Sequence, residues 1–362
     1  MPVESRLANA AVRHRVRLSA SDGHDRFARV TTAAHTSSST GAKRLLVASP
    51  RGFCAGVSYA IEIVDLVLDH YGAPVYVRHE IVHNRHVCDR LRERGAIFVD
   101  DLSLVPPGSL LIFSAHGVAP SVRAEAEVRS LRVIDATCPL VTKVHLEALR
   151  FAREDHRILL IGHRGHVEVE GTLGHAPDRM VLVETVADVE ALTLPADEPV
   201  AVVTQTTLSV DDTREVVEAI QRRFPQARVP KKDDICYATQ NRQTAVKDLA
   251  RHCDLIVVIG SPTSSNANRL VEVARNSGTQ AHLIECAADI EPHWLDDSNA
   301  VGLTAGASTP EALVQETIAR LQSLGCREVE DLETARENVT FTLPRELRAI
   351  AAARGDVVRS GS

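Results

Sequence analysis

Three of the seven cysteines in this 362-residue chain occur in the same local context. Cys54, Cys138 and Cys236 each stand in a short turn directly before a stretch with helical periodicity. Backbone N–H groups at a helix N-terminus favour a thiolate, so we expect the pKa of each thiol to be lowered. Thiolates are soft metal ligands, and three of them at one point would favour a metal centre.

The spacing of these cysteines discriminates between metals. A structural zinc site has four ligands, usually in near pairs, and such pairs are absent here. Three widely separated cysteines instead favour a 4Fe–4S cluster in which one iron stays open to a substrate oxygen. The remaining cysteines are expected to be small buried apolar residues without a ligand role, namely Cys88, Cys253, Cys286 and Cys326.

Polar turns follow two predicted strands after each of the three cysteines. In chain order these turns contain His83, His116, His166, Thr206, Thr207, Ser264, Ser265, Asn266 and Ser308. Histidines, hydroxyls and the amides of helix N-termini together bind phosphate groups. One such turn alone is an ordinary N-cap signal. The set of six predicts a phosphate or diphosphate site.

A carboxyl group accompanies one of these turns. Glu168 lies two residues after His166 and is the predicted proton donor of the site. Glu170 is the alternative donor. Either side chain would also suit the solvated first turn of a helix, where a negative charge is favourable.

The segment His79–His83 matches a competing motif, the H-E-x-x-H signature of zinc hydrolases. That chemistry needs a helix with both histidines on one face. Here the segment follows the predicted strand 75–77 and contains Ile81 and Val82, while a helix is predicted from Asn84 onward. A zinc hydrolase is therefore the second hypothesis, and a redox or iron-sensing module that holds a cluster without turnover is the third.

Short apolar runs that alternate with helical stretches would position these residues. The runs are 44–49, 75–77, 110–113, 158–161, 200–203 and 255–259. This alternation predicts an α/β fold with parallel sheets. Since ligands bind beyond the carboxyl ends of parallel strands, three copies of one unit would surround a central cavity. We predict three pseudo-repeated α/β domains with small, mostly parallel sheets.

The predicted boundaries follow the cysteines. Residues 43–55 form an N-terminal strand and first cysteine turn that join the third domain, and the three domains span residues 56–138, 139–232 and 233–325. Residues 326–362 are a C-terminal extension. Residues 1–42 are rich in Arg, Ser and Thr and are predicted to be a disordered bacterial extension, with an organelle transit peptide as the alternative.

The composition excludes several classes of protein. The net charge is −7 and aromatic residues make up 3 %, which argues against a nucleic-acid-binding protein. The sequence has no apolar run of the ~18–20 residues that a membrane span requires. An odd number of cysteines with no signal peptide before them indicates a reducing cytoplasm. A local electropositive pocket for a small anion remains compatible with this composition.

The sequence resembles the 4-hydroxy-3-methylbut-2-enyl diphosphate reductases, the IspH/LytB family of the non-mevalonate isoprenoid pathway. The matching stretches are 50–57, 77–85, 113–117, 135–143, 165–171, 204–209, 233–237, 264–266 and 304–308. They follow the family order over residues 44–325. The resemblance implies three α/β domains in a cloverleaf around one 4Fe–4S cluster, with Cys54, Cys138 and Cys236 as its ligands and one iron open.

The resemblance also implies roles for the polar residues. Those expected to hold the substrate diphosphate are His83, His116, His166, Ser264, Ser265, Asn266 and Ser308. Thr206 and Thr207 match the pair near the substrate hydroxyl, and Glu168 matches the acid that delivers a proton. The implied reaction removes an allylic hydroxyl with two electrons and gives isopentenyl and dimethylallyl diphosphate. Ferredoxin or flavodoxin is the implied electron donor, and the oligomeric state is left open.

Overall fold

The strands of the described residues form three separate sheets, and every strand pair within them is parallel. The computed structural model describes residues 42–230 and 233–353. The predicted N-terminal extension, apart from residue 42, lies outside the described residues. Among the described residues, no helix combines the length and the apolar character needed to cross a bilayer.

The first sheet has the strand order β3-β2-β4-β5. Its strands are β2 (Val75–Arg78), β3 (Ala96–Val99), β4 (Leu110–Phe113) and β5 (Arg132–Asp135). The helices of this part of the chain are α1 (Ala55–Tyr71), α2 (Arg85–Glu93) and α3 (Pro120–Val128), with the 3₁₀ turn η1 (Leu102–Leu104). The apolar face of α1 packs in one buried cluster with residues of β2 and α2.

The second sheet has the order β7-β6-β8. Its strands are β6 (Arg157–Ile161), β7 (Met180–Val183) and β8 (Val200–Thr204). They alternate with α4 (Pro139–Arg153), α5 (Val167–Leu173), α6 (Val186–Ala191) and α7 (Val210–Arg223). Two buried clusters with different members pack around this sheet, one that includes residues of α7 and one that includes residues of α4.

The third sheet has the order β10-β9-β11-β1-β12. Its strands are β1 (Lys43–Ser49), β9 (Leu255–Ile259), β10 (Gln280–Ile284), β11 (Ala300–Ala305) and β12 (Cys326–Glu333). The accompanying helices are α8 (Tyr237–Ala250), α9 (Ser265–Asn276) and α10 (Glu311–Ser323), with the 3₁₀ turns η2 (Ala287–Asp289) and η3 (Pro292–Leu295). Thus β1 lies in a sheet whose other strands come from the end of the chain, while residues 326–333 form a sheet strand within the predicted extension.

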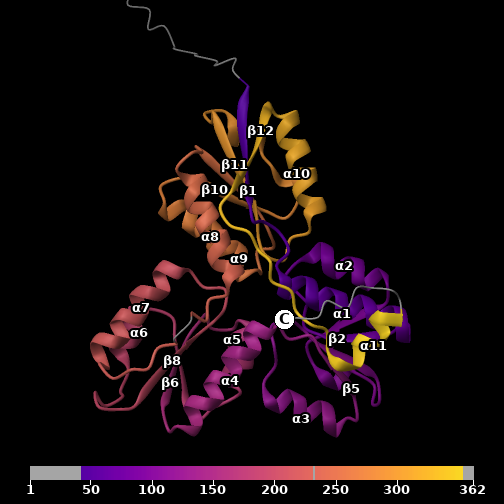
Figure 1. Cartoon of the computed structure of the whole chain (residues 1–362), viewed down its shortest axis with the longest axis vertical. Helices are drawn as coiled ribbons and strands as arrows, with labels where there is room; N and C mark the ends of the chain where they lie inside the picture. Colours follow the sequence, from indigo (N-terminus) through magenta and orange to yellow (C-terminus); the bar gives the residue numbers. More distant parts are fainter. Residues whose placement is uncertain (1–41, 231–232, 354–362) are drawn as a thin grey trace, which may run out of the picture. The chain divides into compact units, whose positions relative to one another are not determined.

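One strand order is repeated in all three sheets. The triplets β3-β2-β4, β7-β6-β8 and β10-β9-β11 each place the first strand after a cysteine helix in the middle. In Figure 1 the colours from indigo to yellow pass through these three sets in turn. The predicted α/β class with three small parallel sheets is confirmed.

The three repeat-matched cysteines occupy equivalent positions in this pattern. Cys54, Cys138 and Cys236 are the N-cap residues of α1, α4 and α8. None of them caps its helix through a side-chain hydrogen bond. Their thiols are therefore not committed to the backbone N–H groups that an N-cap side chain ordinarily satisfies.

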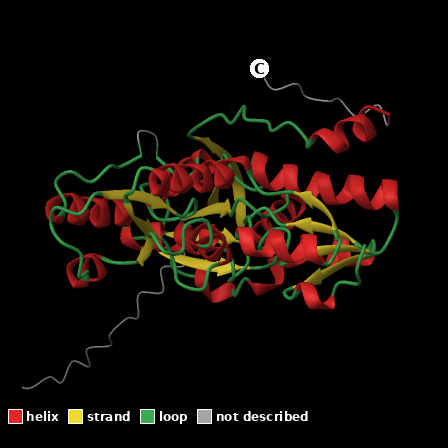
Figure 2. Ribbon diagram, turned by 90° about the horizontal axis from the view of Figure 1, so that it is seen from below, coloured by secondary structure: helices red, strands yellow, loops and turns green. Residues whose placement is uncertain are grey.

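The chain returns to α1 after the third sheet. Thr334 donates through its backbone N–H to Ser49 O at 2.8 Å, and Phe341 packs edge-on against Tyr59 with ring centroids 6.2 Å apart. Helix α11 (Arg345–Ala353) then contacts α1. In Figure 2 this segment is the green loop that leads into the helix nearest the C-terminus mark. Leu347 of α11 is fully buried in the α1 cluster.

Replacing Leu347 by Ala tests whether α11 is part of this core. Because the side chain is 0 % exposed, we expect the free energy of unfolding to fall by about 2–4 kcal/mol. Chemical denaturation measures the loss. Leu104→Ala is the matched control, since Leu104 is 68 % exposed and its loss should stay within about 0.5 kcal/mol. Equal effects of the two substitutions would contradict the docking of α11.

Candidate functional site

Loops from all three sheets line one cavity of about 100 Å³. Every predicted site residue contributes to its wall: Cys54, His83, His116, Cys138, His166, Glu168, Thr206, Thr207, Cys236, Ser264, Ser265, Asn266 and Ser308. These residues follow strand ends or begin helices, as the strand-end argument predicted. The structure therefore brings together residues that are far apart in the sequence.

Close packing at a glycine shows how near two of the cysteines lie. A Cβ atom on Gly56 would stand 2.6 Å from Cys138 Sγ and 3.9 Å from Cys54 Sγ. Gly56 is in the first turn of α1, so its missing side chain leaves the space that the Cys138 sulfur occupies. Among the described residues, no three His, Cys, Asp or Glu side chains form a group that could hold a metal ion. The cysteine ligand set therefore stays a prediction.

The thiols of the metal-free chain are harder to ionise than the sequence suggested. Burial raises the pKa of Cys138 to about 12 and that of Cys236 to about 11, and the nearby Cys54 adds to both shifts. The expected lowering by the helix N-terminus is too weak to offset burial and the neighbouring sulfurs. A bound metal would reverse this balance, because its positive charge stabilises thiolates.

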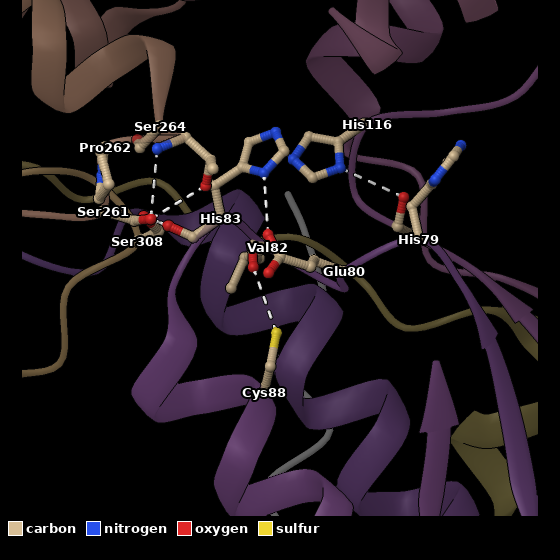
Figure 3. A network of polar contacts seen from close by, with 12 residues as sticks. His79, Glu80, Val82, His83, Cys88, His116, Ser261, Pro262, Ser264 and Ser308 are labelled. Carbon is tan, nitrogen blue, oxygen red and sulfur yellow. Dashed lines mark hydrogen bonds and ion pairs between the residues drawn. The ribbon is translucent and has the colours of Figure 1, made fainter. Parts of the chain in front are cut away.

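Three histidines form one side of the cavity. The His83 and His116 rings are stacked with centroids 4.1 Å apart, and the His166 ring lies 5.4 Å from His83 and 6.2 Å from His116. Figure 3 shows the His83 and His116 rings next to each other, with Ser308 close to His83. The rings come from the turns after β2, β4 and β6, so two sheets supply them.

Two of these histidines, His116 and His166, favour the neutral state. Burial lowers the pKa of His166 to about 3 and that of His116 well below its usual value, with the neighbouring histidines adding to both shifts. His166 Nδ1 accepts from the Glu168 backbone N–H at 3.2 Å, so in the neutral ring Nε2 carries the proton. His83 Nε2 is buried with no partner among the described residues. His166 Nε2–H can therefore donate to an anionic ligand, whereas His83 Nε2 can do so only in a ring that is protonated on both nitrogens, because His83 Nδ1 faces the Glu80 carboxylate.

Hydroxyl and amide groups of the third sheet face the histidines. Ser308 Oγ donates to the His83 carbonyl oxygen at 2.9 Å and so joins the third sheet to the first (Figure 3). Ser264 is the N-cap of α9, and Asn266 lies in the first turn of that helix. Asn266 Oδ1 accepts from the Ala307 N–H at 2.8 Å, which fixes the turn after β11. Ser265 Oγ donates to Thr207 O at 3.2 Å and links the second and third sheets.

Glu168 is the buried carboxyl group of the cavity. Its side chain is 3 % exposed and accepts from the Thr206 backbone N–H at 2.7 Å and from Thr206 Oγ1 at 3.0 Å. Burial raises the pKa of Glu168 to about 7 although both hydrogen bonds oppose the shift. Glu170, the alternative donor, is exposed. The geometry thus separates the two carboxyl groups that the sequence left open.

The H-E-x-x-H segment is not helical. β2 ends at Arg78, and α2 begins at Arg85 with Asn84 as its N-cap, whose side chain accepts from Val87 N. His79 contacts Asp100 at 2.7 Å, whereas His83 faces the cavity and contacts Glu80 at 3.2 Å. The two histidines therefore do not share the helix face that the zinc-hydrolase motif requires.

Two residues next to the cysteines were not singled out from the sequence. Thr239 Oγ1 lies 3.2 Å from Cys236 Sγ and 3.4 Å from Asn266 Nδ2, which connects a cysteine to the polar wall. Its position one turn after Cys236 was the available signal. Arg242, one further turn along α8, is fully buried. An arginine within a helix is ordinarily solvent-exposed, so its sequence context gave no signal.

Residues 45–322 match the family model described as LytB protein. The chain is 54 % identical over 318 residues to the 4-hydroxy-3-methylbut-2-enyl diphosphate reductase of Neisseria meningitidis serogroup C (strain 053442), covering 88 % of this chain and 99 % of the relative. It is 55 % identical over 312 residues to the enzyme of that name from Pseudomonas aeruginosa (strain LESB58), covering 85 % and 99 %.

Solved structures agree with the sequence relatives. The E-1-hydroxy-2-methyl-but-2-enyl-4-diphosphate reductase of Plasmodium falciparum is similar with a TM-score of 0.83 and 42 % identity, over 87 % of this chain and all of that one. A structure titled as (E)-4-hydroxy-3-methyl-but-2-enyl diphosphate reductase, the terminal enzyme of the non-mevalonate pathway, aligns with a TM-score of 0.57 and 33 % identity, covering 78 % and 99 %. The matches span nearly the whole described chain, and by them this protein belongs to the LytB family.

Proposed function

We propose that this chain is a 4-hydroxy-3-methylbut-2-enyl diphosphate reductase. It converts this substrate to isopentenyl and dimethylallyl diphosphate, the last step of the non-mevalonate pathway, with one 4Fe–4S cluster. The observation that carries the proposal is the single cavity onto which three cysteines, three histidines and one buried carboxyl group open. Relatives with 53–57 % identity bear the name of this enzyme.

The polar wall suits a diphosphate. His83 Nε2 is buried with no partner among the described residues, and His166 Nε2 carries a proton because Nδ1 accepts from the Glu168 N–H. The N-terminus of α9 adds backbone N–H groups. Among the described lining residues there is no Lys or Arg. A diphosphate would therefore raise the pKa values of His116 and His166 by its own charge, and protonated histidines would hold it with charge-assisted hydrogen bonds.

Cys54, Cys138 and Cys236 would hold the cluster. Their equivalence at three helix N-termini fits a cluster with one open iron, as does the presence of just these three cysteines among the described residues that line the cavity. When bound, the cluster supplies electrons and a Lewis-acidic iron. The diphosphate wall would orient the allylic carbon chain toward the cysteines.

Glu168 and Thr206 would move the proton. The reaction breaks the allylic C–O bond; two electrons and two protons enter, one proton leaves in water with the oxygen, and the other joins carbon. With a pKa of about 7, Glu168 is mostly protonated below neutral pH, and its O–H can donate to Thr206 Oγ1 at 3.0 Å. Thr206 would pass the hydrogen bond on to the departing hydroxyl.

An electron carrier would complete the reaction, and ferredoxin or flavodoxin, in the cytoplasm, is the proposed donor. A binding module that holds the cluster without turnover is distinguished from this enzyme by assaying product with a chemical reductant.

The cysteine ligand set is tested by substitution. We expect Cys54→Ala, Cys138→Ala or Cys236→Ala to abolish activity and lower the iron and acid-labile sulfide retained after anaerobic reconstitution, because each removes one thiolate ligand. Cys253→Ala is the control, since Cys253 is buried among apolar side chains of the third sheet and α8 and does not line the cavity. Equal iron content in the Cys138→Ala and Cys253→Ala proteins would refute the assignment.

The proton-donor role of Glu168 predicts a split between binding and turnover. Glu168→Gln keeps the shape and a hydrogen bond to Thr206 but cannot supply the proton, so we expect kcat to fall by about 10²–10⁴-fold with KM little changed. Steady-state kinetics under anaerobic conditions measure both constants. Glu170→Gln should behave as the wild type because Glu170 is exposed; near-normal turnover of Glu168→Gln would remove Glu168 from this role.

The raised pKa of Glu168 fixes the direction of the pH profile. Since the pKa rises from 4.5 to about 7, the protonated donor is present at pH 6 and is lost as pH increases through about 7. We expect kcat of the wild type to decline on the alkaline side, with about a tenfold loss per pH unit well above the pKa. The profile of Glu168→Gln should lack this limb, and a decline identical to the wild type would point to a different group.

A further inference from the structure

Arg242 is the largest fully buried side chain among the described residues, with 0 % exposure. It lies in the second turn of α8, the helix that Cys236 caps. A buried guanidinium is costly unless its charge and its N–H groups are satisfied. This site therefore needs a specific set of partners.

One of these partners belongs to the turn of Cys54, and another belongs to the first turn of the helix that Cys236 caps. Arg242 Nη2 donates to Gly52 O at 2.7 Å, with Nε at 3.3 Å from the same oxygen, and Nη1 donates to Ala238 O at 2.9 Å. Gly52 stands two residues before Cys54, and Ala238 two residues after Cys236. One rigid planar group on α8 thus joins the first turn of this helix, which Cys236 caps, to the backbone just before Cys54.

A second contact joins the same turns. The hydroxyl of Tyr237, the residue after Cys236, accepts from the N–H of Ala55, the residue after Cys54, at 3.4 Å. Gly52 has φ of +64°, and a Cβ there would stand 2.9 Å from Thr309 O, so its turn is also confined from the side of β11. Small displacements of Gly52 would therefore be transmitted to Cys54.

The third partner of Arg242 comes from the C-terminal segment. Glu337 faces Arg242 Nη1 at 3.0 Å and Nη2 at 3.4 Å, and it accepts from Asn241 Nδ2 at 3.1 Å. The Glu337 side chain is only 14 % exposed. The segment covers a second cavity of about 820 Å³ that is lined by Cys54, Tyr237, Glu337 and Phe341. Residue 337 lies beyond the residues that the family model matches, which end at 322.

We propose that Arg242 and Glu337 are positioning residues for the metal centre. The planar guanidinium of Arg242 fixes the distance between the turn of Cys54 and the start of the helix that Cys236 caps, and the Glu337 carboxylate holds this guanidinium in place. The C-terminal segment is thereby part of the metal site although it supplies no ligand. This inference rests on the proposed cluster. Lysine cannot replace Arg242, because an ammonium group lacks the planar, divergent N–H donors of a guanidinium group.

The test measures how well the reconstituted cluster is retained. In Arg242→Met, Arg242→Lys and Glu337→Gln, we expect a chelator to remove iron about 10- to 100-fold faster than from the wild type under anaerobic conditions, as is typical for residues that orient metal ligands. The electron paramagnetic resonance spectrum of the dithionite-reduced cluster should also change in Arg242→Met. If Arg242→Lys released iron at the wild-type rate, the positioning role of the Arg242 guanidinium would be refuted.

Two controls separate positioning from loss of stability. Arg223 of α7, a helix beside the second sheet, donates to the carbonyl oxygens of Val189, Glu190 and Leu192. Arg223→Met therefore removes a similar set of guanidinium hydrogen bonds away from the cysteines. Glu330→Gln removes an exposed partner of Arg44. Both should release iron at the wild-type rate, whatever their free energy of unfolding. Acceleration in Arg223→Met equal to that in Arg242→Met would contradict the proposal.

Hydrogen–deuterium exchange of the metal-free protein gives a readout that does not require a cluster. Glu337→Gln should speed exchange in the peptides that contain residues 50–56 and 236–242 but not in those of the second sheet. Unchanged exchange in the peptides that contain residues 50–56 and 236–242 would overturn the inference. If the wild type itself retains no iron and sulfide after reconstitution, the proposed function fails, whereas retention by wild type and variants alike defeats only the positioning role.

Discussion

Parallel pairing is the constraint on which the rest of this structure depends. In a parallel sheet all strands end at one edge, and the helix that follows each strand begins there with its N–H groups exposed. The chain repeats this arrangement three times, with β2, β6 and β9 in equivalent positions. Because the strand ends of all three sheets line one cavity, the cysteines and polar turns meet there.

The cavity carries little charge of its own. Burial keeps the Cys138 and Cys236 thiols protonated and the His116 and His166 rings neutral, and it holds Glu168 close to half-protonated at neutral pH. The charges that belong to the proposed reaction would therefore enter with its ligands. A metal would ionise the thiols and a diphosphate would protonate the histidines, so each binding event releases or takes up protons.

The C-terminal segment shows that the site extends beyond its lining residues. Arg242 is buried where it meets carbonyl oxygens next to two cysteines, and the carboxylate that neutralises it comes from residue 337. The same segment docks α11 on α1 through Leu347. Residues that the sequence analysis assigned to a C-terminal extension thus contribute a strand, a buried ion pair and part of a core.

The sequence alone determined the α/β class, the three-part repeat and the identity of the residues around the cavity, because apolar runs and helix starts are local patterns with a fixed period. It also placed the beginning of α2 near Asn84, which removed the helix that the H-E-x-x-H motif needs. Tertiary structure decided what depends on burial and on partners distant in sequence. Glu168 and Glu170 differ by two positions, yet only the fold places Glu168 against Thr206 and leaves Glu170 in solvent. The direction of the thiol pKa shifts and the burial of Arg242 were likewise hidden, since desolvation and the meeting of charges arise only when separate segments pack together.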